Sequence, residues 1–353
     1  MLRKYLSKKT TDDDWKESIH LDSSVMPLYP NQRCMVTGVG GYLPKTIIHN
    51  DQLSSEFHLN TDDAWIRTRT GITQRHRVSE DETTSDMAIA AARSALNDAH
   101  MDAADLDLII VATSTPDQAF PSTATMVLDA LGSKHAVAFD MNAACSGFLF
   151  ALIMAESYLM QSNKNHALVI GSESMTRLLN WQDRSTAILF GDGAGAVIVS
   201  RTASNDRGIM GHCLFSDGKN GKALHDLHVT PPSADRPMGV IVMDGQAVFR
   251  EAVSQLISST KALLEEKNID LADVDWIIPH QANKRILDRM CTDMNIDHGK
   301  MLYTGDMHAN TSAASIPLTW WKARQNNTIK PGQLLLLQAF GAGFTWGCCL
   351  VRS

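Results

Sequence analysis

Unbroken apolar runs of strand length alternate along the chain with longer segments whose apolar residues recur at helical spacing. Leu108–Ala112, Ala167–Gly171 and Val197–Ser200 are runs of the first kind and predict buried strands. Thr84–His100 and Phe148–Met160 are of the second kind and predict helices. Strands that are apolar throughout need cover on both faces. The alternation therefore predicts an α/β fold with helices on both sides of its sheets.

The stretch 136–148 joins one predicted strand to one predicted helix. Ala136–Phe139 is a short apolar run that suits a buried strand, and Cys145 follows where the chain turns into the helix. Free backbone N–H groups and the macrodipole at a helix N-terminus stabilise a thiolate, so we expect a lowered pKa for Cys145. From this stretch alone, a reactive thiol and an inert buried cysteine are about equally good interpretations.

Two further elements are expected before this stretch. Met35–Gly41 predicts a strand that ends in a glycine turn, and Thr61 is expected to be the N-cap of a helix that starts in residues 62–66. Residues 1–30 are polar and highly charged and have no clear period. They are interpreted as an N-terminal extension of the main body.

The second half of the chain repeats the first. Three pairs of segments match in order: Asp105–Ile110 with Asp273–Ile278, Asp140–Ser146 with Asp306–Ser312, and Gly193–Ala196 with Gly341–Phe344. Their offsets are 168, 166 and 148 residues. Ordered matches of this kind indicate an internal duplication of α/β units. We therefore expect an N-terminal half over residues 31–205 and a C-terminal half over residues 206–353.

The duplication brings distant residues to one place. If a pseudo-twofold axis relates the halves, Cys145 and Asn310 both lie at the N-terminal ends of paired central helices. His280 ends the strand that the repeat pairs with Leu108–Ala112. A thiol, an imidazole and an amide at one locus predict an acyl-transfer site.

Composition narrows the classes of partner and compartment. The 353-residue chain is 44% hydrophobic and 20% charged, and its net charge of −7 does not favour a nucleic-acid partner. We expect no apolar run long enough to span a membrane. Six cysteines without framework spacing indicate a reducing, cytoplasmic compartment. The 13 histidines form no metal motif, and His225 and His228 are interpreted as part of a solvated loop.

Around Cys145, His280 and Asn310 the sequence resembles the thiolase-fold condensing enzymes, and most closely the β-ketoacyl-acyl carrier protein synthase III family. The resemblance runs from about Arg33 to Arg352. It rests on these motifs: Asp63–Ile66 with Thr68–Ile72, Ala144–Gly147, Phe190–Ala196, Pro279–Asn283, Asn310–Ser315 and Phe344–Gly347. It implies a thiolase-like fold, with the duplicated halves packed in α-β-α-β-α layers.

The resemblance also implies an activity, the priming step of fatty-acid biosynthesis. An acyl-CoA, with acetyl-CoA as the expected donor, would acylate Cys145, and malonyl-acyl carrier protein would then lose CO2 and condense with the acyl group. His280 and Asn310 would stabilise the enolate by hydrogen bonds, while the backbone N–H groups of Cys145 and Ala342 would form the oxyanion hole. The thioester of coenzyme A is a substrate, and no resident cofactor or metal is expected.

Binding residues follow from the same resemblance. The residues expected to contact CoA are Thr61, Trp65, Arg69, Arg184, Gly245, Phe249 and Asn283. The acyl pocket would be lined by Met175, Phe190, Phe340 and, reaching over from the other subunit of a homodimer, Phe120. The residues expected to dock the acidic carrier protein are Arg250, Gln281, Lys284 and Arg285, with Arg289 as a further candidate.

Three positions depart from the family pattern, and three alternatives stay open. Thr292 and Asp293 stand where many relatives carry lysines, and Ala342 stands where the family usually has a glycine. The nearest alternative is a sibling condensing enzyme that uses another acyl donor or acceptor in secondary metabolism. A thiolase is disfavoured because no Cys-x-Gly loop supplies a second cysteine as base. A catalytically silent, carrier-binding scaffold is the alternative of another class.

Overall fold

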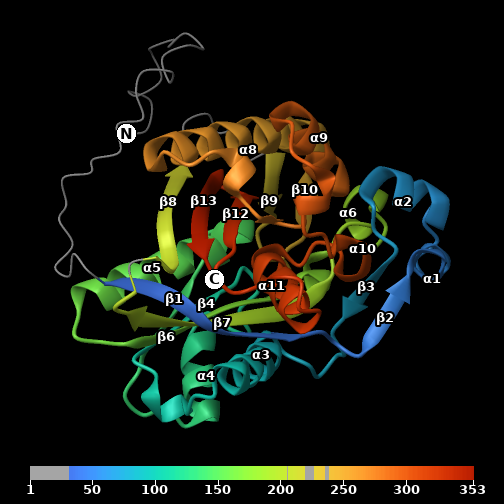
Figure 1. Cartoon of the computed structure of the whole chain (residues 1–353). Coiled ribbons are helices and arrows are strands. Elements are labelled where there is room, and N and C mark those ends of the chain that lie inside the picture. The colour runs from blue at the N-terminus through green and yellow to red at the C-terminus, as the bar shows by residue number, and fades with distance from the viewer. Residues whose placement is uncertain (1–31, 205, 219–225, 235–237) are drawn as a thin grey trace, which may run out of the picture.

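The computed structural model of the chain describes residues 32–353 except 205, 219–225 and 235–237 (Figure 1). The expected extension over residues 1–30 therefore lies outside the described residues. All strands of one large sheet fall between Arg33 and Thr202, and all strands of the other between Gly208 and Arg352. The division into halves at residues 205 and 206 stays a prediction.

The first large sheet has five strands in the order β1-β7-β6-β4-β5. They are β1 (Arg33–Tyr42), β7 (Asp192–Thr202), β6 (His166–Ser174), β4 (Leu108–Ala112) and β5 (Val137–Met141). β4 runs parallel to both β5 and β6, whereas β7 is antiparallel to β6 and β1. The predicted strands at 35–41, 108–112, 167–171 and 197–200 are thus confirmed.

The second large sheet has four strands in the order β11-β12-β13-β8. They are β11 (Trp276–Pro279), β12 (Leu334–Gly341), β13 (Thr345–Arg352) and β8 (Gly208–Ser216). β11 is parallel to β12, and β13 is antiparallel to β12 and β8, so the pattern of the first sheet recurs without a counterpart of β5. Two small ribbons complete the strands: β2 (Thr46–His49) with β3 (Gln74–Arg77), and β9 (Leu227–Val229) with β10 (Ile241–Met243).

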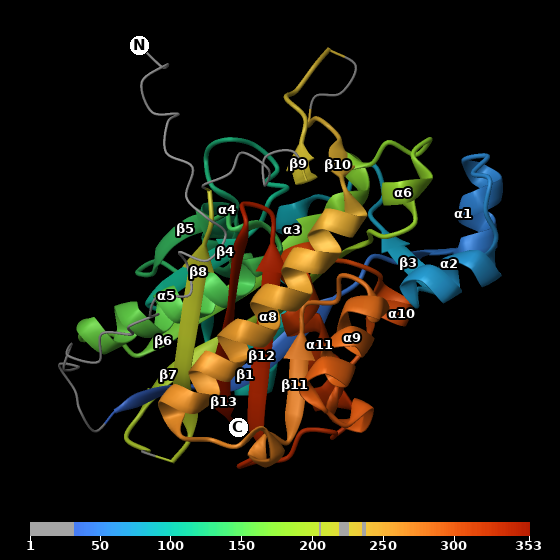
Figure 2. The ribbon, with the colours of Figure 1, turned by 90° about the horizontal axis from the view of Figure 1, so that it is seen from above.

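Helices cover both sheets on both faces. α3 (Thr84–Ala99) and α4 (Thr123–Leu131) pack on the outer face of the first sheet, and α8 (Gly245–Lys267) and α9 (Lys284–Met294) on that of the second (Figure 2). α5 (Gly147–Gln161) and α11 (Ser315–Gln325) lie between the sheets. The α-β-α-β-α layering is therefore confirmed. The remaining helices are α1 (Asn50–Glu56), α2 (Asp63–Thr70), α6 (Arg184–Ala187) and α10 (Gly305–His308).

The structure confirms the duplication and corrects its register. The equivalent elements start 168 residues apart: β4 and β11, β6 and β12, α5 and α11, and the 3₁₀ turns Ala144–Ser146 and Ser312–Ala314. The match of Asp140–Ser146 at 166 residues is thus two residues out of register. The match of Gly193 with Gly341 is wrong, because Gly193 lies in β7 and Gly341 in β12, the counterpart of β6. The two glycine-rich segments matched because their compositions are similar, although they belong to strands that are not equivalent.

Three local expectations also need correction. The N-cap of α2 is Asp62, whose carboxylate accepts from the N–H of Trp65, and not Thr61. Ala144–Gln161, α5 with the turn before it, is long and apolar enough by composition to span a membrane, so the expectation of no such run is wrong. Its Phe148 and Leu152 are fully buried between the sheets, as in the core helix of a globular protein.

β5 is an exposed edge strand and not the buried strand that its apolar sequence predicted. The side chains of Val137 and Phe139 are 48% and 38% exposed. Phe120, which precedes α4, is 85% exposed. A strand at a sheet edge has a neighbour on one side only, so sequence hydrophobicity alone did not reveal its exposure in the single chain.

Candidate active site

Cys145 lies in the 3₁₀ turn between β5 and α5 and is 7% exposed. The turn is fastened to β13 from both sides, because Ser146 Oγ donates to the carbonyl of Thr345 at 2.8 Å and Thr345 Oγ1 donates to that of Ala143 at 3.0 Å. Ala144 has a left-handed φ of +47°, which a non-glycine residue rarely adopts. The strained turn is therefore held by the C-terminal half of the chain.

The end of β12 packs directly on this turn. A Cβ atom added to Gly341 would lie 2.8 Å from the backbone nitrogen of Cys145, so only glycine leaves this approach open. Phe340, one residue earlier, is buried and lines the cavity in front of the thiol. Ala342, which stands where the family usually has a glycine, also lines the cavity, and its φ is not positive, so an alanine fits this position without left-handed backbone strain.

His280 follows β11 and is buried. Its backbone N–H donates to the carbonyl of Gln338 at 2.7 Å, and its ring Nδ1 lies 2.7 Å from Ser315 Oγ at the start of α11. Burial lowers the pKa of His280 to about 4, against a smaller opposing effect of the Ser312 backbone. The imidazole is therefore neutral near pH 7 and carries one N–H for donation.

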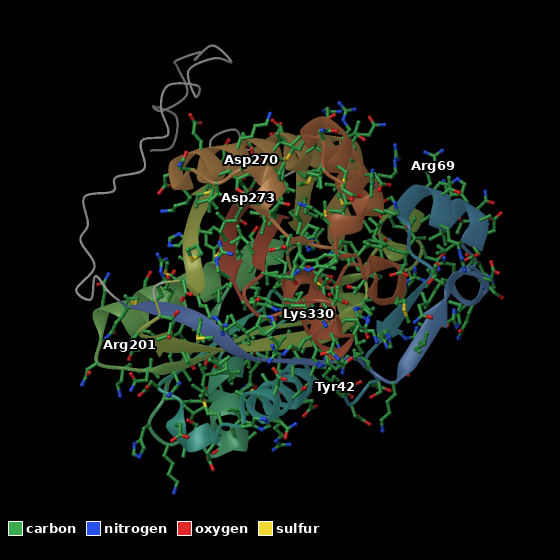
Figure 3. All side chains as sticks on the ribbon, viewed as in Figure 1. Tyr42, Arg69, Arg201, Asp270, Asp273 and Lys330 are labelled. Carbon is green, nitrogen blue, oxygen red and sulfur yellow. The ribbon has the colours of Figure 1, made fainter. Side chains whose placement is uncertain are left out.

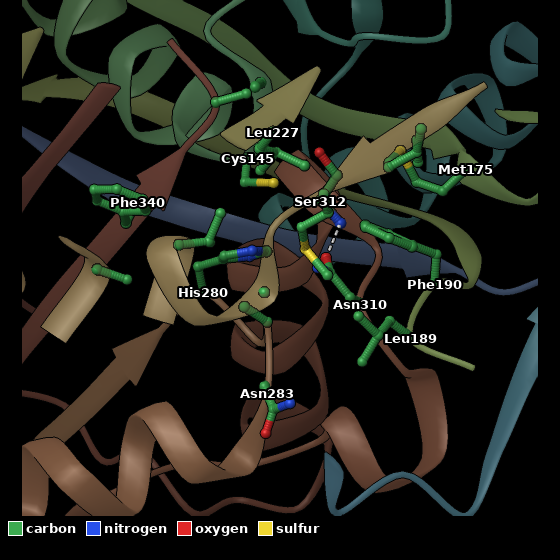
Figure 4. Close-up of a pocket in the computed structure, with 18 of the residues that line it drawn as sticks. Cys145, Met175, Leu189, Phe190, Leu227, His280, Asn283, Asn310, Ser312 and Phe340 are labelled. Atoms are coloured by element: carbon green, nitrogen blue, oxygen red, sulfur yellow. Dashed lines mark hydrogen bonds between the residues drawn. The ribbon is translucent and has the colours of Figure 1, made fainter. Parts of the chain in front are cut away.

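Asn310 is oriented at two points. Its backbone N–H donates to the carbonyl of Leu189 at 2.9 Å, and its Oδ1 accepts from the backbone N–H of Ser312 at 2.8 Å (Figure 4). Because the amide oxygen is engaged by the turn, the amide NH2 group is the part available for donation into the cavity. The role of Asn310 as a hydrogen-bond donor to the substrate stays a prediction.

Cys145, His280 and Asn310 line one cavity (Figure 4), so their predicted convergence is confirmed. Other predicted residues line the same cavity: Met175, Phe190, Phe340 and Ala342 near the thiol, and Gly245, Phe249 and Asn283 farther along. Neutral hydrogen-bond donors beside a thiol in a mostly apolar cavity suit the stabilisation of a developing oxyanion or enolate.

The pKa of Cys145 is raised and not lowered, contrary to expectation. Burial, with a smaller contribution from the Glu173 charge, raises it to about 11, against the opposing effect of a hydrogen bond with the Ser312 side chain. Desolvation of the thiolate therefore outweighs the stabilising surroundings of the helix start. The resting site holds a neutral thiol and a neutral imidazole.

Thr61, Trp65, Arg69 and Arg184 do not line the cavity, but Arg69 and Arg184 both lie against Trp65. The guanidinium carbon of Arg184 lies 4.5 Å from the ring centroid of Trp65, and that of Arg69 lies 5.5 Å away. Figure 3 shows Arg69 at the outer surface of α2. Arg184 rests directly on the indole here, so a sandwich around an adenine requires the guanidinium to move off the ring.

The predicted carrier-docking residues differ in their surroundings. Arg250 and Arg285 are exposed, and the guanidinium of Arg285 lies 5.9 Å from the ring centroid of Phe249. Lys284 pairs with Asp288 at 2.6 Å. Gln281 is buried, and its amide binds the backbone of Pro279 and of the loop 302–305, so its assignment to a docking surface is wrong.

Asp293, the acid in place of an expected lysine, acts within its own helix. Its carboxylate pairs with the Arg289 guanidinium at 2.8 Å. Arg289 is therefore a neutralised cation and a weaker docking candidate than Arg285.

Sequence reasoning missed part of the cavity wall. The wall also includes Leu227, His228, Ile241 and Met243, which belong to the β9–β10 ribbon and its end. The solvated-loop interpretation is wrong for His228, which lies in β9, whereas His225 lies outside the described residues. Two short apolar segments on either side of a proline-rich loop were the available signal. In the described part of the chain, no cluster of side chains suits a metal ion.

Two family models match the chain. The model 3-Oxoacyl-[acyl-carrier-protein (ACP)] synthase III matches residues 139–218, and the C-terminal model of the same name matches residues 264–353. The chain is 47% identical over 327 residues to the beta-ketoacyl-[acyl-carrier-protein] synthase III of Rhodospirillum rubrum and 45% identical over 323 residues to that of Ehrlichia canis. Each alignment covers 91% of this chain and 99% of the relative.

Solved structures agree with these relatives. The 3-oxoacyl-[acyl-carrier-protein] synthase III of Aquifex aeolicus superposes with a TM-score of 0.85 at 40% identity, covering 91% of this chain and 100% of the other. The priming beta-ketosynthase of the R1128 polyketide pathway superposes equally well, with a TM-score of 0.85 at 32% identity, covering 91% and 96%. The chain belongs to the β-ketoacyl-acyl carrier protein synthase III family, the acyltransferases that condense an acyl-CoA with malonyl-acyl carrier protein to start fatty-acid biosynthesis.

Proposed function

We propose that this enzyme primes fatty-acid synthesis in the cytoplasm with a short acyl group, acetyl-CoA being the first choice of donor. The observation that carries the proposal is the single cavity that holds Cys145, His280 and Asn310. Cys145 is the nucleophile that takes up the acyl group. His280 and Asn310 donate hydrogen bonds to the malonyl thioester oxygen while CO2 leaves. The backbone N–H groups of Cys145 and Ala342 serve the oxyanion of the acyl-transfer steps.

The neutral state of His280 supports this division of roles. A neutral imidazole at a buried site donates an N–H without adding a net charge beside the leaving carboxylate. Asn310 supplies a second neutral donor whose oxygen is already engaged. Both groups suit the stabilisation of an enolate better than the removal of a proton at neutral pH.

The primer is enclosed near the thiol by Met175, Phe190 and Phe340, which are all buried. A wall of these side chains favours a short acyl chain. The CoA moiety is proposed to extend along Gly245, Phe249 and Asn283. Its adenine then stacks between Trp65 and Arg184, close to Arg69 and Thr61.

We also propose a homodimer formed through the apolar edge around β5, with Phe120 closing the acyl pocket of the partner subunit. Val137, Phe139 and Phe120 form an exposed apolar edge in the single chain. The double variant Val137→Lys/Phe139→Lys should sediment as a monomer. Ile47→Lys, which replaces an equally exposed apolar side chain on β2, should remain dimeric. A monomeric and fully active parent enzyme would contradict the shared pocket.

A panel of acyl-CoAs assayed with malonyl-acyl carrier protein tests the substrate assignment. We expect acetyl-CoA to give the highest kcat/KM and the product to be acetoacetyl-acyl carrier protein. A clear preference for long or branched donors, or for malonyl-CoA over the carrier-bound form, would favour a sibling enzyme of secondary metabolism. Failure to release CoA from any donor would favour the silent scaffold.

A further inference from the structure

Glu173 is a fully buried carboxylate beside the active site that the proposed mechanism does not use. It lies near the end of β6, and β4 separates this strand from β5, which leads into the turn that carries Cys145. Its Oε2 accepts from the N–H of Ser114 at 3.0 Å and the hydroxyl of Thr115 at 2.8 Å, and its Oε1 accepts from the Ser312 hydroxyl at 2.9 Å. None of the ion pairs within the described residues includes Glu173. Burial of a carboxylate that is held by neutral donors alone destabilises the folded state. Such a residue is therefore a candidate for a functional role.

Ser312 connects this carboxylate to the catalytic groups. Its hydroxyl donates to Glu173, and its backbone N–H donates to Asn310 Oδ1. Ser312 also lines the cavity with Cys145, and its side chain lowers the pKa of the thiol. Ser312 also has a left-handed φ of +49°, a conformation that a non-glycine residue rarely adopts and that its contacts hold in place. The Ser312 side chain therefore connects the cavity that holds the Cys145 thiol with the Glu173 carboxylate in the core.

We propose that Glu173 accepts the proton of Cys145 during acylation, with the Ser312 hydroxyl as the relay between them. The Cys145 sulfur forms a bond to the thioester carbon while its proton moves to the Ser312 oxygen and the Ser312 proton moves to Glu173 Oε1. The bond from that carbon to the CoA sulfur then breaks. The proton returns through Ser312 to the departing CoA sulfur, and the carboxylate is restored.

The pKa values of Glu173 and His280 favour Glu173 as the proton acceptor. Burial raises the pKa of Glu173 to about 7, against the hydrogen bonds from Thr115, Ser114 and Ser312, so a substantial share is ionised near neutral pH. The pKa of His280 is lowered to about 4, which makes its imidazole the weaker base. Acylation should therefore rise with pH as Glu173 ionises.

The variant Glu173→Gln separates a proton acceptor from a structural support. Removal of the carboxylate charge lowers the pKa of Cys145, so alkylation by iodoacetamide at pH 7 should become faster. Acylation by acetyl-CoA should become about 100-fold slower and lose its rise with pH around 7. A residue that only supports the fold would slow both reactions together.

The variant Ser312→Ala breaks the relay and keeps the carboxylate, so it tests the proposal even where Glu173→Gln folds poorly. Its acylation should also slow, but its alkylation should slow as well, because the Ser312 hydroxyl lowers the pKa of the thiol. The two variants thus have opposite effects on alkylation and the same effect on acylation. Unchanged acylation in Glu173→Gln, or parallel slowing of both reactions in it, would overturn the proposal. The inference rests on Cys145 as the nucleophile, which mapping of the acyl group in the parent enzyme tests separately.

Discussion

The two halves of the molecule present different chemistry on the same local frame. In each half a 3₁₀ turn leads into a central helix, and Ala144 and Ser312 occupy equivalent places with nearly equal φ of +47° and +49°. The residue after each differs in function, because Cys145 in one turn corresponds to the buried Ala313 in the other. The duplicated backbone thus supplies the strained turn, and single substitutions decide which turn carries the nucleophile.

The strands that face these turns differ in the same way. Glu173 near the end of β6 reaches the turn of the C-terminal half, and its counterpart Gly341 at the end of β12 packs on the turn of the N-terminal half. One position holds a buried acid, and the other holds no side chain at all. The missing side chain at Gly341 lets β12 approach the Cys145 turn, whereas the carboxylate of Glu173 binds the Ser312 turn.

Replacement of the nucleophile should have the largest effect, because Cys145 is the residue that distinguishes the two turns. Cys145→Ser should form no acyl-enzyme with acetyl-CoA and should lose condensation entirely, because a serine hydroxyl lacks the nucleophilicity of sulfur at this site. Intact-protein mass measures the acyl adduct. Ala313→Cys, a thiol at the equivalent place in the other half, should gain no second adduct because Ala313 does not line the cavity. An acyl group mapped to Cys34, Cys213 or Cys291 would falsify the assignment.

The donors of the C-terminal half should affect one half-reaction only. His280→Ala and Asn310→Ala should each slow the decarboxylation of malonyl-acyl carrier protein by about 100- to 1,000-fold, the usual cost of one lost oxyanion donor. Acylation of Cys145 should stay within several-fold of the parent, because it depends on the turn and the relay. Release of labelled CO2 and of CoA measures the two steps. Equal losses of acylation and decarboxylation would contradict the assignment of His280 and Asn310 to the decarboxylation step.

An added methyl group at Gly341 tests whether acylation needs the close packing of β12 on the Cys145 turn. Gly341→Ala should slow acylation by about 10- to 100-fold, because the new Cβ displaces the backbone N–H of Cys145 from its oxyanion contact. Alkylation by iodoacetamide forms no oxyanion and should change little. Gly218→Ala, where the added atom meets open space, is the matched control. If Gly341→Ala acylates at the parent rate, the hole lies elsewhere.

A smaller effect should distinguish the exposed cations. Arg285→Glu should raise the KM for malonyl-acyl carrier protein several-fold at low salt and leave acylation by CoA thioesters unchanged. Arg289→Glu is the matched control, because Arg289 is already neutralised by Asp293. Steady-state kinetics at two ionic strengths measure both variants. Equal effects of the two reversals would place the docking surface away from Arg285.

The smallest expected effect concerns acid stability in the half that lacks the thiol. Burial, with His76 and Lys322, lowers the pKa of His308 to about 4. Between about pH 6.5 and 4 the unfolded chain binds this proton and the folded chain does not, so stability falls as the pH falls. His308→Gln should reduce this slope by up to about 1.4 kcal/mol per pH unit. Urea unfolding at pH 7 and pH 5 measures the slope, and parallel changes in the two proteins would exclude His308.

The sequence alone predicted most of the fold and the three residues that converge in its cavity. Apolar runs predicted the strands, and the repeat predicted that Cys145, His280 and Asn310 line one site. The burial of Gln281, the exposure of β5 and the pKa of Cys145 could not be predicted, because each depends on packing between segments distant in sequence. The part played by Ser312 and Glu173 was hidden for the same reason, since 139 residues separate the two partners of that hydrogen bond.

The shared cavity has a kinetic consequence. Residues next to the thiol and residues proposed for the pantetheine arm line the same space. Acyl-CoA and malonyl-acyl carrier protein both deliver their groups on such an arm, so the first product must depart before the second substrate enters. Initial rates should then give parallel double-reciprocal lines, and an excess of the carrier substrate should inhibit by occupying the unacylated enzyme. The cellular ratio of CoA thioesters to loaded carrier, and not either concentration alone, would then set how often a new chain begins.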